Sequence, residues 1–375
     1  MFLNEVERLE TVRACRDCPM CHHVDTVTLI TGREANTSRG RAMLLWGLEK
    51  GLLRWESEGV ANILYQAFVD GLAQEWCEGN YNIDELVIQG RRSLVDRGLA
   101  PAEVAAVAAY LRATGNPYGR NEQPLGALVE QAGGRVSDTP QVALFLGSTA
   151  RLLASQSAIA LIRILHELAI PFSVFEGETD SGFLSYQMGD YNAAAEQARK
   201  TAALLSGTQS KTLVVLGAGD YRMFTTRYAR LQAPLSPALQ VLHVTEFLSQ
   251  LLQQQKLAPR KKLATKVTYH DPSSLARFTY VIDPPRRVLS ALAGPNYVEM
   301  EFSGRKSHTC GETGGVSITY PELAVTAARL RIDQARLTGA KILACADPDC
   351  EVLLSQVGAP DMEIKDITEL LADAL

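Results

Sequence analysis

Three of the seven cysteines of this chain lie close together near its N-terminus, in the sequence Cys15-Arg-Asp-Cys18-Pro-Met-Cys21. This C-x2-C-x2-C spacing lets three thiolates reach three iron atoms of one cubane cluster while backbone amides point at its sulfides. A tetrahedral zinc site with His22 or His23 as the fourth ligand is the alternative. Because clustered thiols without a role are prone to oxidation, the motif predicts a metal centre.

A cubane cluster needs a fourth ligand, and Cys77 is the candidate for it. In ferredoxin-type domains with two clusters, the last cysteine of each run binds the other cluster. The segment 77–91 resembles the end of such a second run, in which the last cysteine precedes a helix closing in Gly-Arg. We therefore predict one 4Fe-4S cluster held by Cys15, Cys18, Cys21 and Cys77.

The positions that would bind a second cluster hold other residues. Counted back from Cys77, the other cysteines of a second run fall at positions 67, 70 and 73, and the last cysteine of the first run falls at position 25. These positions hold Asp25, Ala67, Asp70 and Ala73. All four ligands of one cluster are missing together, which we interpret as one surviving redox centre.

Composition narrows the kind of protein that carries this motif. The 375 residues are 46% hydrophobic, enough for a sizeable core in two or three domains. The net charge of −5 argues against nucleic acid as a partner. We find no apolar stretch typical of a signal peptide or a membrane span, so we expect a soluble, cytoplasmic protein. Peripheral docking on a membrane complex through another subunit stays compatible with this expectation.

The cysteine motif must be positioned by helices, because the first third of the chain shows helical apolar spacing. This spacing predicts helices over Arg41–Leu53, Val60–Trp76 and Asp84–Asp96. We assign residues 1–120 to a helical ferredoxin-type iron–sulfur domain. Arg39 and Arg41 follow the cysteine loop, where they either stabilise the negative charge of a cluster, contact an acidic partner or begin a solvated helix.

From about residue 141 short apolar strands alternate with helices, which is typical of a parallel α/β sheet. The expected strands are Val142–Leu146, Phe172–Phe175 and Thr212–Leu216, then Lys266–Tyr269, Tyr297–Met300 and Lys341–Ala344. Because the same order occurs twice, we predict two related α/β modules, residues 121–255 and 256–375. The fold class is thus α/β, with a helical ferredoxin-type domain before two parallel modules.

Several short motifs follow one another along almost the whole chain. They are Thr37-Ser-Arg-Gly-Arg41, Gly115-Asn-Pro-Tyr-Gly119, Phe145-Leu-Gly-Ser-Thr149, Gly189-Asp190, His270-Asp-Pro-Ser273, Cys310-Gly311 with Gly314-Gly315, and Asp347-Pro-Asp-Cys350. In this order the chain resembles the iron–sulfur subunits with paired cysteine-rich (CCG) domains. These include the heterodisulfide reductase catalytic subunit and the iron–sulfur subunits of glycolate oxidase and anaerobic glycerol-3-phosphate dehydrogenase.

The chain departs from this family where the family carries an early Cys, a Cys-Cys-Gly and a late C-x2-C in each module. In the family these cysteines can hold an unusual iron–sulfur cluster that reduces disulfides. The first module has Ser148, Asp180-Ser181-Gly182 and the loop Gly217–Asp220 at the matching positions. It therefore lacks the cysteines for such a cluster, which makes this chain a degenerate member.

The second module keeps some of these cysteines. Ser273 replaces the early cysteine, Thr309-Cys310-Gly311 replaces Cys-Cys-Gly, and Asp347 with Cys350 replaces the late pair, with Cys345 nearby. Three interpretations stay open for Cys310, Cys345 and Cys350. They hold zinc or a second cluster together with His270, His308 or Asp347; Cys345 and Cys350 form a redox pair; or all three are buried small hydrophobes.

A single cubane cluster is a one-electron carrier. The resemblance therefore implies an accessory, electron-transfer subunit of an oxidoreductase, heterodisulfide reductase-like or 2-hydroxy acid dehydrogenase-like, with a flavoprotein or another iron–sulfur protein as its redox partner. One alternative is a structural or assembly subunit with a metal that is not redox-active. Another is residual disulfide or thiol reductase activity in the second module. We identify no catalytic residue from the sequence.

Overall fold

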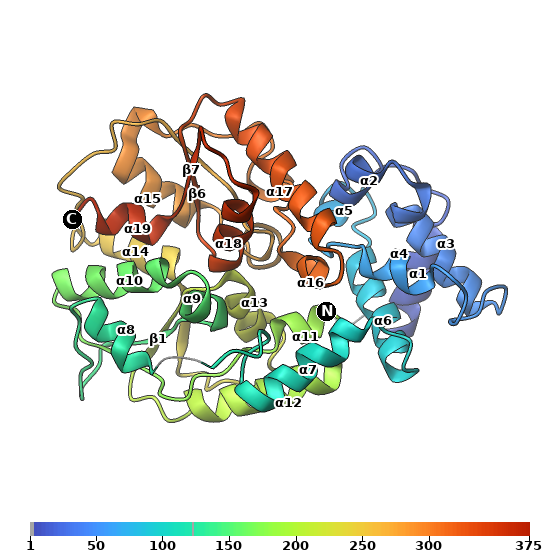
Figure 1. Ribbon diagram of the computed structural model, residues 1–375, viewed down its shortest axis with the longest axis horizontal. Coiled ribbons are helices and arrows are strands. Elements are labelled where there is room, and N and C mark those ends of the chain that lie inside the picture. The colour runs from blue at the N-terminus through green and yellow to red at the C-terminus, as the bar shows by residue number, and fades with distance from the viewer. Residues whose placement is uncertain (1–3, 122–123) are drawn as a thin grey trace.

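The computed structural model describes residues 4–121 and 124–375, and Figure 1 shows three regions in it. The helices within residues 5–96 gather at one end of the molecule, the helix over residues 102–114 lies beside helices of the first sheet, and two parallel sheets with their covering helices fill the rest (Figure 1). The N-terminal helices are α1 (Glu5–Cys15), α2 (Thr26–Thr31), α3 (Ser38–Glu49), α4 (Val60–Tyr65), α5 (Leu72–Glu75), α6 (Ile83–Asp96) and α7 (Ala102–Thr114). The helical N-terminal region predicted from apolar spacing is confirmed.

The helix expected over Val60–Trp76 is wrong, because the chain forms two short helices there, α4 and α5. The turn between them contains Val69 at φ 48° and Gly71 at φ 82°, both in the left-handed region that interrupts a helix. Asp84 accepts a hydrogen bond from the Gly71 amide at 2.5 Å and fixes this turn. The apolar spacing therefore reported burial of residues 67–69 and not a continuous helix.

The first sheet has four parallel strands in the order β2-β1-β3-β4. They are β1 (Val142–Phe145), β2 (Phe172–Val174), β3 (Thr212–Val215) and β4 (Gln240–His243). Helices α8 (Leu125–Gln131), α9 (Ser148–Leu152), α10 (Ser155–Glu167), α11 (Phe183–Gln187), α12 (Tyr191–Leu205), α13 (Ala218–Thr226) and α14 (Val244–Gln253) accompany it. The three predicted strands are confirmed, and β4 was missed because this edge strand begins with exposed residues and has no continuous apolar run.

The second sheet has three parallel strands in the order β5-β6-β7. They are β5 (Val267–Tyr269), β6 (Ile342–Cys345) and β7 (Glu363–Asp366), with helices α15 (Asp283–Ala293), α16 (Val316–Thr319), α17 (Pro321–Arg336), α18 (Pro348–Val357) and α19 (Ile367–Ala372). The strand expected over Tyr297–Met300 is wrong, since this segment makes a single parallel bridge to Val267. The third strand of this sheet is instead the edge strand β7. It was missed because its Glu and Lys residues interrupt the apolar run by which a buried strand is recognised.

One buried arginine joins the three regions. Arg91 on α6 is fully buried, and its guanidinium donates to the carbonyl oxygens of Leu64 and Ala67 in the N-terminal region. The same group donates to Gln187 of the first module at 2.7 Å and to Gly314 of the second at 2.8 Å. Burial lowers the pKa of Arg91 to about 10, so it stays charged at neutral pH. These bonds fix the N-terminal helices against helical segments of both modules.

Within residues 4–121 and 124–375, no helix combines the length and the apolar character needed to cross a membrane.

Candidate metal centre

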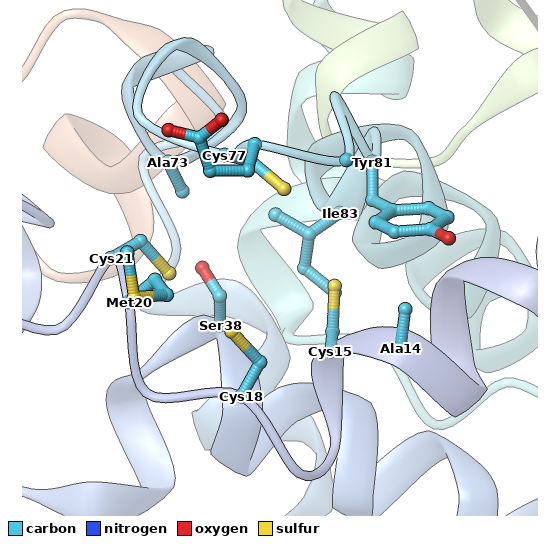
Figure 2. Close-up of a pocket in the computed structure, with 12 residues that line it drawn as sticks. Ala14, Cys15, Cys18, Met20, Cys21, Ser38, Ala73, Cys77, Tyr81 and Ile83 are labelled. Atoms are coloured by element: carbon cyan, nitrogen blue, oxygen red, sulfur yellow. The ribbon is translucent and has the colours of Figure 1, made fainter.

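All four cysteines predicted as cluster ligands line one cavity of about 140 Å³. Figure 2 shows their sulfur atoms turned toward this common space, with Ser38 beside them. Cys15 ends α1, Cys18 and Cys21 lie in the loop that follows, and Cys77 lies in the turn between α5 and α6. The structure therefore brings Cys77 to the N-terminal motif across more than fifty residues of intervening chain.

Local hydrogen bonds position these thiols. The Cys18 amide donates to the Cys15 carbonyl at 3.2 Å, which turns the chain directly after α1. At the other wall the Cys77 amide donates to Gln74, and the Cys77 carbonyl accepts from the Asn80 amide at 2.9 Å. Asn80 has φ 52°, a conformation that Asn tolerates better than most residues. The two turns present their cysteines from opposite walls of one cavity.

The electrostatics of the cavity favour a cationic group between the thiols. Burial raises the pKa of Cys15 to about 12, and the neighbouring Cys77, Cys21 and Cys18 act in the same direction. Burial likewise raises the pKa of Cys21, and a hydrogen bond with Ser38 opposes this effect. Thiols this close repel one another when ionised, and bound metal removes the penalty because it stabilises thiolates directly. The soft donors and mainly apolar lining fit an iron–sulfur cluster.

The two histidines proposed as alternative zinc ligands do not line the cavity. The Nδ1 atom of His22 lies 3.7 Å from a carboxylate oxygen of Glu34, and the ring of His23 packs edge-on against Trp76. Of these six candidate ligands, the four cysteines line the cavity and the two histidines do not.

One edge of the cavity reaches the surface. Cys18 is exposed, whereas Cys15, Cys21 and Cys77 are half-buried, and the neighbouring Met20 is 53% exposed. A group held here would be partly covered by the half-buried cysteines and would be reached from outside through the Cys18 edge.

Two of the four positions that lack a second-cluster cysteine hold aspartates, Asp25 and Asp70, and each of them pairs with a buried arginine. Arg41 is buried and pairs with Asp25 at 3.5 Å, so it neither begins a solvated helix nor contacts a partner. Asp70 pairs with Arg277 at 3.5 Å. Burial raises the pKa of Asp25, with Arg41 lowering it and Asp70 raising it. Arg39 differs from Arg41, since it is partly exposed and lies 3.5 Å from Glu34.

In the second module, Cys310 and Cys350 lie together with His270 and Glu312, and their potential ligand atoms are all within 4.8 Å of one another. The Cys310 thiol donates to Glu312 at 3.0 Å, and the Cys350 thiol donates to Asp347 at 3.3 Å. Glu312 was not among the residues singled out from the sequence. The sequence feature that could have pointed to Glu312 is its place two residues after Cys310, from which its carboxylate reaches the Cys310 thiol.

The remaining candidates of the second module have other partners. Cys345 is outside this group, and its thiol faces the Lys365 carbonyl at 3.6 Å. His308 bonds to Gln334 through Nδ1 at 2.6 Å. Cys310, Cys345 and Cys350 are all fully buried, so none is accessible to a substrate from solution.

His270 is held in one orientation by Arg331, whose Nε donates to His270 Nδ1 at 3.0 Å. Burial lowers the pKa of His270 well below its usual range, so the ring is neutral. With Nδ1 accepting, the proton is on Nε2, which has no hydrogen-bond partner among the described residues. Within this buried group the His270 ring therefore carries an N–H that has no hydrogen-bond acceptor among the described residues.

Comparisons with known proteins show which family this chain belongs to. Residues 267–355 match the cysteine-rich domain family (CCG). The chain is 32% identical over 313 residues to a subunit of the dihydromethanophenazine:CoB--CoM heterodisulfide reductase of Methanosarcina barkeri, a match that covers 81% of this chain and 76% of that protein. It is 23% identical to the probable iron-sulfur-binding oxidoreductase FadF of Bacillus subtilis, over 79% of this chain and 44% of FadF.

A solved structure supports the fold alone. The crystal structure of a hypothetical protein from Helicobacter pylori superposes on 100% of this chain and 73% of its own, with a TM-score of 0.60 and 9% sequence identity.

Proposed function

We propose, from the premise that this chain belongs to the family of iron–sulfur subunits with cysteine-rich (CCG) domains, that it transfers single electrons within an oxidoreductase complex. The observation that carries this proposal is the cavity into which Cys15, Cys18, Cys21 and Cys77 all face. Such a cavity offers the four thiolates that a 4Fe-4S cluster requires. A bound cluster supplies reversible one-electron chemistry.

The residues of this chain determine how that centre behaves. The four thiolates hold it, and the surrounding Ala73, Ile83 and Tyr81 exclude water from it. A dry lining strengthens the interaction between the cluster charge and nearby dipoles, which sets the reduction potential. The exposed edge at Cys18 and Met20 is the side through which a partner reaches the centre. That partner is a flavoprotein or another iron–sulfur protein.

Metal analysis and electron paramagnetic resonance on anaerobically purified protein test this function. We expect a brown protein with about four irons per chain and, after reduction, the signal of a single cubane cluster. A colourless protein without iron overturns the proposal. Zinc in place of iron favours the alternative of a structural or assembly subunit.

A second candidate function rests on the grouping of Cys310, Cys350 and Glu312 within 4.8 Å, which suits a thiophilic divalent ion such as Zn²⁺. The three anionic ligands, the dication and the nearby Arg331 balance in charge. His270 joins as a ligand only by giving up the hydrogen bond from Arg331; otherwise it donates Nε2–H to a thiolate. About one zinc per chain in addition to the iron supports this site, and its absence in zinc-supplemented protein overturns it.

The burial of all three cysteines argues against the third function considered, a disulfide or thiol reductase. That function requires thiols that a substrate can reach.

A further inference from the structure

A second cavity, of about 180 Å³, lies where the three regions of the molecule meet. One wall is the turn between α5 and α6, and another is the end of α13. The third wall comes from the second module, where the π-helix η2 (Ser274–Thr279) packs on α13 and the short helix η4 (Gly304–Lys306) packs on α5. The lining is mainly polar and none of it belongs to the cysteine cavity.

Arginines outnumber acidic residues in this lining. Arg227, Arg277 and Arg305 all line the cavity, whereas Glu75 is the single acidic residue among those that line it. Glu75 pairs with Arg305 at 2.6 Å. The carboxylates that approach the other two arginines, at 3.6 Å from Arg227 and 3.5 Å from Arg277, come from residues outside the lining. Each of the three arginines thus has a carboxylate within 3.6 Å, and what distinguishes the lining is its number of guanidinium donors.

Arg277 and Arg227 differ in how well they are bonded. Arg277 uses its nitrogen atoms in short bonds to Asp70, Ser273 and Ser307, so it contributes charge and no free donor. Arg227 is 6% exposed, and its Nε atom has no hydrogen-bond partner among the described residues. Its other bonds are long, at 3.4 Å to the Thr226 carbonyl and 3.6 Å to the carboxylate of its acidic neighbour.

A fourth arginine lies behind the wall of this cavity. Arg222 is 2% exposed, and its guanidinium carbon lies 3.3 Å from the ring centre of Phe278, which lines the cavity. Its Nη1 atom also has no hydrogen-bond partner among the residues that the structure describes. Two buried guanidinium groups with unmade hydrogen bonds on one side of a polar cavity lower the cost of placing an anion there.

We propose that this cavity binds a small oxyanion, the carboxylate or phosphate group of a small molecule. Arg227 donates to it from Nε, and Arg305 at the exposed rim admits it and contributes the second charged donor. Carboxylate and phosphate groups both present two neighbouring oxygen atoms, to which one guanidinium can donate two parallel hydrogen bonds. The volume restricts the ligand to one anionic group with a short attached chain.

The position of the cavity links it to the cluster site. Gln74, Asn80 and Asn82 line it, and these residues flank Cys77 on both sides. Gln74 already donates to the Asn80 side chain at 2.9 Å across this turn. An anion bound to Arg227 and Arg305 would hold the turn against both modules. We therefore expect it to slow the loss of iron, a consequence that rests on the proposed function.

Calorimetric titration of the cluster-loaded protein tests the site. Inorganic phosphate and succinate are titrated separately at constant ionic strength, with chloride as the background anion. We expect saturable binding of at least one, and the better of the two identifies the class of ligand. Arg305→Gln should weaken binding about tenfold or more, because a charge-assisted hydrogen bond is lost. Arg227→Gln should weaken it further.

Arg260→Gln is the matched control, since Arg260 is a 69% exposed arginine that pairs with Glu167 far from the cavity. Its affinity for the anion should equal that of the unchanged protein. If Arg227→Gln does not fold, the exposed Arg305→Gln decides. No saturable binding of either anion, or equal affinities in Arg305→Gln and Arg260→Gln, overturns the site.

The link to Cys77 is measured separately, as the rate at which a chelator removes iron with and without the better anion. A slower rate in the unchanged protein, but not in Arg305→Gln, supports it. Anion binding that persists in metal-free protein upholds the cavity even where the proposed electron-transfer function fails.

Discussion

The N-terminal and C-terminal cysteines of this chain have the same chemistry in opposite environments. Cys15, Cys18, Cys21 and Cys77 face a common cavity that opens to the surface at Cys18. Cys310 and Cys350 are fully buried, and each thiol donates to a carboxylate. Burial raises the pKa of Cys15 and of Cys310 alike, to about 12.

Between Cys15 and Cys310 the difference is therefore in access and in neighbours, not in the pKa of the thiol. At the N-terminal site the thiols have mainly one another as polar partners, which leaves them for a metal centre that a partner protein can reach. At the C-terminal site carboxylates already accept from the thiols, an oriented imidazole lies beside them, and burial closes them off from solvent. A site of the first kind suits electron exchange, and a site of the second kind suits a closed structural ion.

The largest effect is expected from Cys77→Ala, which should remove the cluster as completely as Cys18→Ala does. Each variant deletes one of four thiolate ligands, so iron should fall from about four per chain to near zero. Iron analysis and visible absorbance measure this. Cys345→Ala is the control and should keep full iron, because Cys345 lies outside both groups. Unchanged iron in Cys77→Ala contradicts the pairing of distant cysteines.

The second prediction separates the two sites. Cys310→Ser should abolish zinc binding in the second module, while iron content and the paramagnetic signal of the reduced protein stay unchanged. The two sites share no ligand, so their metals should respond independently. Zinc and iron are counted in the same sample. Simultaneous loss of both metals would show that the comparison between two independent sites is wrong.

A third prediction concerns the residue that joins the regions holding the two sites. Arg91→Met leaves four buried carbonyl oxygens without their donor, so we expect the free energy of unfolding to fall by about 3–5 kcal/mol. Chemical denaturation measures the change. Arg92→Met is the control at the neighbouring, 54% exposed position and should change stability by less than about 1 kcal/mol. If both variants lower the free energy of unfolding equally, the hydrogen bonds of Arg91 do not stabilise the junction of the three regions.

The smallest effect is a pH dependence beside the lost second cluster. Burial, with a smaller contribution from Asp70, raises the pKa of Asp84 to about 7 from 3.8. The folded state then holds a proton that the unfolded state loses, so stability falls as the pH rises from about 4 to about 7. In Asp84→Asn the fall in Tm over this pH range should be smaller by a few degrees.

Thermal unfolding of Asp84→Asn between pH 5 and pH 8 checks this slope. Asp96→Asn on the same helix is the control, because Asp96 is 56% exposed and should leave the slope unchanged. If Tm depends on pH equally in the unchanged protein and in both variants, Asp84 does not hold a proton in the folded state.

Sequence patterns predicted much of the fold, and their errors have physical causes. Buried parallel strands such as β1 and β3 are continuous apolar runs, which is why they could be recognised. The edge strands β4 and β7 carry exposed polar residues and lack that signal. Apolar spacing over residues 60–76 reports burial, and it cannot show that Val69 and Gly71 adopt left-handed conformations.

Local spacing by itself determined that Cys15, Cys18 and Cys21 lie close together, since seven residues of chain allow few other arrangements. The assignment of Cys77 stays a prediction, supported by its place in the same cavity. Tertiary structure alone decided that Cys310, Cys350, His270 and Glu312 meet without Cys345. It also decided that Arg227, Arg277 and Arg305 border one cavity. Their distances depend on how separate elements pack, and packing of distant segments leaves no periodicity in the sequence.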